Sequence, residues 1–182
     1  MILIIMGVSG SGKTTIGTLL SEKMSILFAD ADDFHPSSNK SKMSSGIPLT
    51  DEDREPWLDI LKDMISRWDS EGTDAILACS ALKKSYRNHL LSGLNQLTAH
   101  HSQNDVLRTG IFVFLKGSLE CIHRRMSQRK DHFMPQALLQ SQFKDLEEPD
   151  PEKENVITVN VSSSTDEIVK CIELKLQSFV KF

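Results

Sequence analysis

The chain has 182 residues, of which 39% are hydrophobic and 25% are charged, and its formal net charge is −4. Its length and balance predict one globular domain over residues 1–182 and exclude disordered, collagen-like and low-complexity proteins. The negative charge argues against general binding to nucleic acid or to an anionic membrane. No apolar run reaches the roughly 20 residues of a membrane-spanning helix, and the N-terminal segment lacks the basic flank of a signal peptide, so we expect a cytoplasmic protein.

The N-terminal part of the chain is predicted to form a strand, a helix, a strand and a loop. Residues 2–6 are a continuous apolar, β-branched run before a glycine-rich segment, which is typical of a buried parallel strand. Apolar side chains recur at helical spacing over residues 16–24, which predicts a helix. Residues 26–29 form a second apolar run that ends in acidic residues, whereas residues 36–50 lack a sustained apolar period. We expect a second strand and then a loop with room for a short helix.

The middle of the chain is predicted to contain a long helix and a third strand. Pro56 suits the first turn of a helix, and one face stays apolar until Gly72 provides a stop. Residues 75–79 are the third apolar run, and a short helix is predicted over residues 84–91. Residues 92–109 are polar and show no clear pattern, so we expect an exposed, mobile excursion there.

The remaining segment continues the alternation of strands and helices. Residues 111–115 are the fourth apolar run, and residues 156–161 are predicted to form the fifth strand. Helical spacing of apolar residues covers 119–126 and 138–143, and a closing helix is predicted over 168–179. This alternation predicts an α/β layered fold with a central parallel sheet of about five strands flanked by helices.

A phosphate-binding motif joins the first predicted strand to the first predicted helix. It has the full G-x-x-x-x-G-K-[ST] spacing and consists of Gly7, Val8, Ser9, Gly10, Ser11, Gly12, Lys13 and Thr14. The glycines let successive backbone N–H groups and the helix N-terminus face a polyphosphate. Lys13 reaches the β- and γ-phosphates, and the Thr14 hydroxyl coordinates Mg²⁺. The motif predicts a nucleoside triphosphate site.

Switch and motor proteins with this motif fit the sequence less well than a kinase does. A GTPase switch needs Asp-x-x-Gly after a strand, but residues 69–72 carry these letters in a predicted helix. Its base-reading motif, Asn-Lys-x-Asp, fails at Lys42. Motor ATPases have an apolar strand that ends in an acidic residue, whereas the third predicted strand ends in Cys79 and Ser80.

Charged residues elsewhere can supply the other parts of a small kinase. Asp30 and Asp32 follow the second predicted strand, where one carboxylate can orient an attacking hydroxyl and another can hold Mg²⁺ through water. The basic residues fall in two clusters: Lys83, Lys84 and Arg87, and then Arg124, Arg125, Arg129 and Lys130. Arginines on a closing lid neutralise the phosphoryl oxygens and exclude water. The plain alternative is that these charges cap a turn or lie on solvated helices.

Short motifs along the whole chain resemble those of the gluconate kinases. Besides the phosphate-binding motif they include Asp30-Ala31-Asp32-Asp33-Phe34-His35-Pro36, Lys42-Met43, Gly46-Ile47-Pro48-Leu49, Pro56-Trp57-Leu58, Cys79-Ser80-Ala81-Leu82-Lys83-Lys84, His132-Phe133-Met134-Pro135 and Ser141-Gln142-Phe143. The resemblance implies a three-layer P-loop kinase fold with a short lid at about residues 124–134, often in a homodimer. It also implies phosphorylation of the 6-hydroxyl of D-gluconate with ATP and Mg²⁺ in the cytoplasm.

The resemblance implies roles for individual residues as well. It puts the phosphate-binding motif on ATP, Thr14 and Asp30 on Mg²⁺, and Asp32 at the accepting hydroxyl. It puts Arg125, Arg129 and His132 in the lid. The residues implied to hold the carboxylate and hydroxyls of the substrate are His35, Arg54, Lys84 and Arg87, around a substrate-binding segment at about residues 35–56. A carboxylate needs a bidentate guanidinium, so an arginine in this set is chemically reasonable.

Two other classes stay open from the sequence. A shikimate-kinase-like or nucleotide-kinase-like enzyme would share the phosphate-binding motif, the acidic pair and the lid. A non-catalytic nucleotide-binding module would keep Lys13 but would not need Asp32 and the lid arginines together. The joint presence of these residues favours an enzyme.

Overall fold

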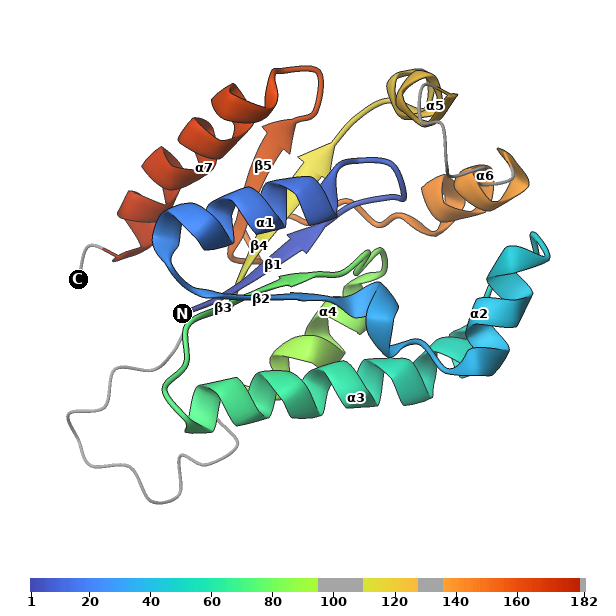
Figure 1. Ribbon diagram of the computed structural model, residues 1–182, viewed down its shortest axis with the longest axis horizontal. Helices are drawn as coiled ribbons and strands as arrows, with labels where there is room; N and C mark the ends of the chain where they lie inside the picture. Colours follow the sequence, from blue (N-terminus) through green and yellow to red (C-terminus); the bar gives the residue numbers. More distant parts are fainter. Residues whose placement is uncertain (95–109, 128–135, 181–182) are drawn as a thin grey trace.

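Five short parallel strands form the sheet at the centre of the structure, a computed structural model that describes residues 1–94, 110–127 and 136–180 (Figure 1). The strands are β1 (Ile2–Met6), β2 (Leu27–Asp30), β3 (Ala75–Ala78), β4 (Gly110–Lys116) and β5 (Val156–Asn160). Their order is β2-β3-β1-β4-β5, and every neighbouring pair is parallel. The predicted α/β fold with a five-stranded parallel sheet is confirmed.

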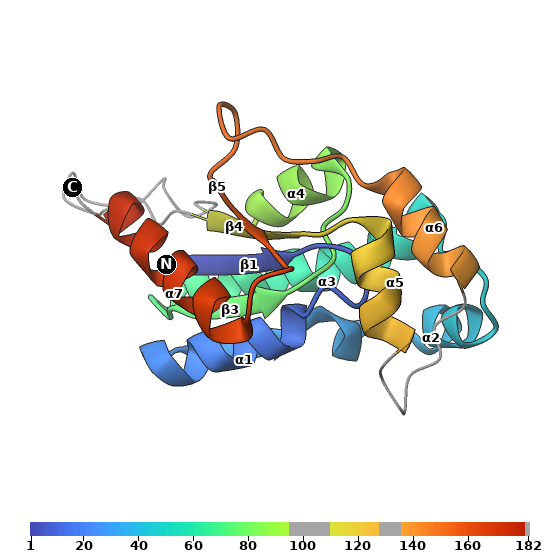
Figure 2. The same cartoon turned by 90° about the horizontal axis from the view of Figure 1, so that it is seen from above.

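The described helices cover both faces of the sheet and one of its ends. They are α1 (Lys13–Met24), the 3₁₀ turn η1 (Ala31–Phe34), α2 (Ser37–Ser44), α3 (Asp51–Ser70), α4 (Lys84–Leu91), α5 (Leu119–Ser127), α6 (Gln136–Asp145) and α7 (Thr165–Val180). Helices α1 and α7 cover one face, and α3 and α4 cover the other (Figure 1). Helices α2, α5 and α6 lie beyond the carboxyl ends of the strands (Figures 1 and 2). None of the helices in the described ranges is long and apolar enough to cross a membrane.

The central strand β1 supplies side chains to two hydrophobic cores. Ile2 and Ile4 pack into the core under α3 and α4, whereas Leu3 and Ile5 pack into the core under α1 and α7. All of these side chains are fully buried. Burial on both faces explains why this strand reads as an uninterrupted apolar run, without the alternation of a half-exposed strand.

Helix α3 starts earlier than the sequence analysis predicts. It begins at Asp51, and the preceding Thr50 forms a capping box with Asp53. The Thr50 hydroxyl accepts from Asp53 N at 3.3 Å, and the Asp53 carboxylate accepts from Thr50 N at 3.0 Å. These two bonds satisfy N–H groups that a helix start leaves without partners. The prediction that Pro56 lies in the first turn is wrong, because Pro56 lies inside the helix.

Two other predictions about segments between the strands are confirmed, and a third falls mostly outside the described residues. Residues 36–50 contain the eight-residue helix α2, so the short helix for which the loop had room is present. Residues 69–72 close α3 and form no strand-to-loop junction, which confirms that their Asp-x-x-Gly letters are not a switch motif. The predicted excursion at residues 92–109 lies outside the described residues from position 95 onward.

A buried arginine fastens α4 to the loops beside the sheet. The Arg87 side chain is 1% exposed and forms a two-pronged ion pair with Glu154, at 2.6 Å from Nε and 3.0 Å from Nη2. Its Nη1 donates to the carbonyls of Ala81, Leu82 and Glu147 at 3.0–3.2 Å. Ala81 has a φ of 43°, a left-handed conformation that is uncommon for residues with a side chain. Arg87 therefore stabilises the loop after β3 and joins it to the segment before β5.

Replacing Arg87 should destabilise the fold. Arg87→Ala leaves a mostly buried carboxylate and three carbonyls without their partner, so the free energy of unfolding should fall by about 3–5 kcal/mol at neutral pH. Urea unfolding followed by circular dichroism measures this change. The control Arg67→Ala, at an exposed site on α3, should change it by less than about 0.5 kcal/mol.

The same ion pair should make stability depend on acid. The hydrogen bond from Arg87 lowers the pKa of Glu154, so the stabilisation by its carboxylate is present above the unfolded pKa of about 4.3. It is lost as the pH falls through the lower folded pKa. The stability difference between the wild type and Glu154→Gln should therefore be largest near neutral pH and narrow below about pH 4. A difference that does not change with pH would contradict this account of the pair.

Candidate active site

The phosphate-binding loop connects β1 to α1 and takes its shape from left-handed glycines. Gly10 has a φ of 80° and Gly12 a φ of 100°, values that side-chain-bearing residues rarely adopt. A Cβ at Gly10 would also lie 2.6 Å from Met126 Cγ on α5. The Lys13 ammonium donates to the carbonyls of Gly7 and Val8 at 3.0 and 3.1 Å, within the loop. The loop thus presents backbone N–H groups and a fixed positive charge on one surface, which suits a polyphosphate.

Asp30 links the start of α1 to the end of β2. The Thr14 hydroxyl donates to Asp30 Oδ2 at 2.6 Å, and Asp30 Oδ1 accepts from Asp32 N at 3.1 Å. The direct Thr14–Asp30 contact brings together two oxygen ligands of the kind that Mg²⁺ prefers. The described residues contain no group of three or more His, Cys, Asp or Glu side chains that could hold a metal alone. This donor set fits an ion that is shared with substrate phosphates and water.

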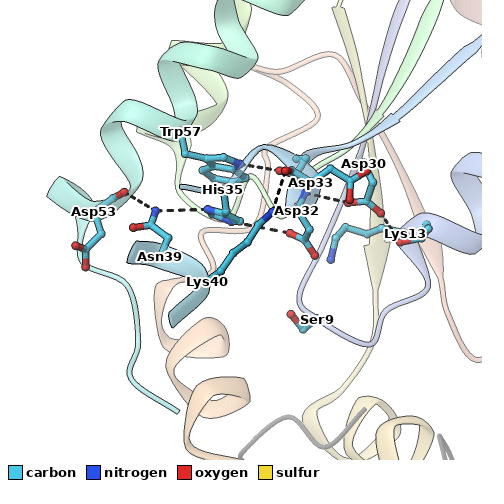
Figure 3. Close-up of polar contacts among 12 residues, drawn as sticks. Ser9, Lys13, Asp30, Asp32, Asp33, His35, Asn39, Lys40, Asp53 and Trp57 are labelled. Carbon is cyan, nitrogen blue, oxygen red and sulfur yellow. Dashed lines mark hydrogen bonds and ion pairs between the residues drawn. The ribbon is translucent and has the colours of Figure 1, made fainter. Parts of the chain in front are cut away.

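A cavity of about 430 Å³ opens beside the phosphate-binding loop. Its lining residues are Ser9, Lys13, Asp32, His35, Met43, Ser44, Pro48, Leu49, Arg54, Trp57, Ser80, Leu82, Leu138, Ser141 and Gln142. The Asp32 side chain is 81% exposed, and Figure 3 shows it pointing toward Lys13. The sequence-predicted residues Lys13, Asp32, His35 and Arg54 are thus brought together around one space.

His35 forms one wall of the cavity and is held in a fixed orientation. Its ring stacks on the Trp57 ring with centroids 4.2 Å apart, and the indole N–H of Trp57 donates to Ala31 O at 2.8 Å (Figure 3). The Asn39 side chain lies 3.5 Å from His35 Nδ1 and donates to Asp53 O at 2.7 Å. Burial lowers the pKa of His35, although the Asp32 carboxylate 4.0 Å away opposes the shift. The imidazole is therefore mainly neutral at pH 7.

Arg54 reaches the cavity from α3, and its neighbours fix its guanidinium. Its Nη1 donates to Tyr86 Oη at 3.0 Å and lies 3.5 Å from an Asp145 carboxylate oxygen on α6. Tyr86 in turn donates to Asp51, which also accepts from Lys83 at 2.7 Å. The side chain of Arg54 is 12% exposed, so this cation is largely removed from bulk water at the cavity wall.

Two predicted substrate residues lie elsewhere. Neither Lys84 nor Arg87 lines the cavity. Lys84 is exposed at the start of α4, and Arg87 is buried against Glu154 and three backbone carbonyls. The geometry does not support a substrate-binding role for either residue. The reason is the direction of α4, which turns Arg87 toward the segment before β5.

The predicted lid segment falls within the described residues only as far as position 127. Arg125 lies on α5, where Nη1 approaches Ser11 O at 3.5 Å and Nη2 donates to Val161 O. This predicted lid residue therefore contacts the phosphate-binding loop. Arg129 and His132 lie outside the described residues.

Comparison with known proteins identifies the family. A family model for shikimate kinases matches residues 9–177. A probable gluconokinase of Xenopus tropicalis is 47% identical over 175 residues, which cover 95% of this chain and 92% of that protein. The solved gluconokinase of Sinorhizobium meliloti is 36% identical with a TM-score of 0.79, and the match covers 97% of this chain and 96% of that one. The chain belongs to the gluconokinase family.

The match to shikimate kinases concerns the fold that both groups share. The shikimate kinase of Aquifex aeolicus is 21% identical with a TM-score of 0.57, over 98% of this chain and 97% of that one. The predicted three-layer P-loop kinase fold, the recognised family and the prediction of an enzyme are confirmed. A non-catalytic module is not favoured for a member of the gluconokinase family.

Three residues at or beside the site of this gluconokinase-family chain were not assigned an individual role from the sequence. Trp57 and Gln142 lie within motifs quoted for the resemblance, but only the structure shows Trp57 stacking on His35 and Gln142 bonding to Ser9. Asn39 is 2% exposed and bridges His35 to α3. A buried amide in a polar segment has no periodic signal, so Asn39 could not be recognised from spacing.

Proposed function

We propose that this protein transfers the γ-phosphoryl group of ATP to the 6-hydroxyl of D-gluconate, giving 6-phospho-D-gluconate. The observation that carries the proposal is one cavity lined by the phosphate-binding loop, the Asp32 carboxylate and the Arg54 guanidinium. An acceptor with a hydroxyl at one end and a carboxylate at the other matches these groups in a single orientation. The names of the gluconokinase relatives support this acceptor.

The nucleotide would occupy the side formed by the phosphate-binding loop. The left-handed glycines free backbone N–H groups for phosphate oxygens, and Lys13 adds a positive charge beside them. Thr14 and Asp30 would hold Mg²⁺, the first directly and the second through water. When bound, the ion neutralises charge on the β- and γ-phosphate oxygens.

Asp32 is the group proposed to act on the accepting hydroxyl. Its carboxylate faces the cavity beside Lys13, so it can orient the hydroxyl toward the phosphate and take its proton late in the transfer. Arg125 lies against the loop, where its charge supports the transferred phosphoryl group. Roles for Arg129 and His132 in lid closure stay predictions of the family resemblance.

The acceptor side of the cavity is proposed to bind a carboxylate and several hydroxyls. Arg54 offers a guanidinium that Tyr86 and Asp145 hold in place. Because this guanidinium is already oriented, binding a carboxylate costs less conformational entropy. His35 is mainly neutral, so its ring can donate a hydrogen bond to a hydroxyl or accept one without adding charge to the site. Residues 35–56 thus form the proposed acceptor segment.

The family resemblance also predicts a homodimer in the cytoplasm. Dependence on ATP supports the cytoplasmic location, because ATP is maintained at high concentration inside cells. Both statements stay predictions for this chain.

The acceptor can be tested directly with a panel of substrates. A coupled assay of ADP release should give a kcat/KM for D-gluconate at least about 10²-fold above those for glucose, shikimate and AMP. Glucose lacks the carboxylate and would therefore lose the charge-assisted hydrogen bonds that we propose between a substrate carboxylate and the Arg54 guanidinium. A comparable kcat/KM for shikimate would return the protein to an unassigned small-molecule kinase.

Asp32→Asn should reduce turnover more than it reduces ATP binding. An amide can still position a hydroxyl but cannot accept its proton, so kcat should fall by about 10²-fold while the KM for ATP changes little. The matched control is Asp33→Asn, which neutralises the adjacent exposed carboxylate outside the cavity lining. Equal kcat values for the two variants would indicate that Asp32 has only a structural role in the turn.

A further inference from the structure

A reciprocal pair of hydrogen bonds joins α6 to the phosphate-binding loop. The Gln142 carboxamide oxygen accepts from Ser9 N at 2.7 Å, and its nitrogen donates to Ser9 Oγ at 3.0 Å. The two residues are 133 positions apart in the sequence, so the contact depends entirely on the fold. Both residues line the 430 Å³ cavity. One side chain of α6 thus holds a residue of the phosphate-binding loop that lines the cavity.

The same helix also contacts the acceptor side. Leu138, Ser141 and Gln142 follow the i, i+3, i+4 spacing of one helical face, and all three line the cavity. One turn further, Asp145 lies 3.5 Å from the Arg54 guanidinium. Helix α6 therefore bridges the two ends of the site, with Gln142 on the phosphate-binding loop and Asp145 on the residue proposed to hold the carboxylate.

A neutral amide suits the chemistry of this bridge. Gln142 accepts from one group and donates to another at the same time, which neither a carboxylate nor an ammonium can do. A charged side chain here would also act on the triphosphate beside it. The two contacts to Ser9 therefore use both the acceptor and the donor of the Gln142 amide.

We propose that Gln142 is a positioning residue for phosphoryl transfer, which aligns the phosphate-binding loop with the acceptor residues by fixing Ser9. The proposal rests on the proposed function for the identity of the acceptor. Small displacements at the reacting centre lower the rate steeply, because transfer depends on alignment of the attacking and leaving oxygens. Loss of the contact should therefore reduce kcat and leave most of the nucleotide affinity, which other loop N–H groups supply.

The first test compares two glutamines of the same helix. Gln142→Ala should lower kcat with gluconate by about 10- to 100-fold, with less than about a threefold change in the KM for ATP. Gln140→Ala changes an exposed residue of α6 at equal cost in helix propensity and should behave like the wild type. Gln142→Met keeps the side-chain length without the hydrogen bonds and replaces the alanine variant if that one does not fold. A kcat equal to that of Gln140→Ala would overturn the proposal.

A double-mutant cycle tests whether Gln142 acts through Ser9. Ser9→Ala removes the hydroxyl contact. If Gln142 acts through Ser9, the fold-decrease in kcat of the double variant should be smaller than the product of the fold-decreases of the two single variants. Losses in kcat that multiply independently would overturn the proposal, because Gln142 would then act by another route.

A readout without substrate separates this proposal from the proposed function. Amide hydrogen exchange of Ser9, followed by NMR, should be faster in Gln142→Ala than in Gln140→Ala, because the N–H loses its acceptor. Unchanged exchange would contradict the coupling. Absence of gluconate phosphorylation by the wild-type chain would instead contradict the proposed function, and the exchange result would not depend on it.

Discussion

The parallel alignment of three strand ends is the constraint on which the site depends. In the register of the sheet, Ala78 of β3 pairs with Ile5 of β1 and with Asp30 of β2, so these strands end at one level. The loops that follow them are the phosphate-binding loop, the acidic turn and the segment from Cys79 to Lys83. A hydrogen bond from Gly7 N to Ser80 O at 3.2 Å links two of these loops directly. Residues far apart in the sequence meet here because the strands are parallel and end within one residue of each other in this register.

Several charged groups at the site have a defined neighbour that holds them in place. Thr14 fixes Asp30, and Tyr86 and Asp145 fix Arg54. Preorganised groups of this kind act on developing charge without reorganising during the reaction. Arg87 shows the opposite use of the same chemistry. Its guanidinium is paired with Glu154 and backbone carbonyls, so it stabilises the loop after β3 and does not line the cavity.

The sequence predicted the parts of the site that local patterns encode. The glycine spacing before Lys13 and the acidic residues after the second strand located the nucleotide side, because strand ends in a parallel sheet converge. Strands β1, β3 and β4 were predictable because their runs are apolar on both faces, whereas β5 alternates buried and exposed residues from Ile157 to Asn160. The start of α3 was mispredicted at Pro56, since the Thr50–Asp53 capping box was a stronger start signal.

Side-chain direction and long-range contacts were not predictable in the same way. Arg87 was grouped with Lys84 by charge, but which way an arginine points on a short helix depends on its tertiary partner, here Glu154. The bond between Ser9 and Gln142 spans 133 positions and has no periodic signature. Such contacts depend on how α6 packs against the loop, which spacing along one chain does not encode.

The measurement that tests the account most directly is the position of the phosphate in the product. Proton-coupled ³¹P NMR of the product from ATP and D-gluconate distinguishes a primary from a secondary phosphate ester, because a terminal CH₂ splits the signal into a triplet and a CH gives a doublet. With the carboxylate held at Arg54 and the far end of the chain at Asp32, the account predicts the triplet of a 6-phosphate. A doublet, or no ester signal at all, would contradict it.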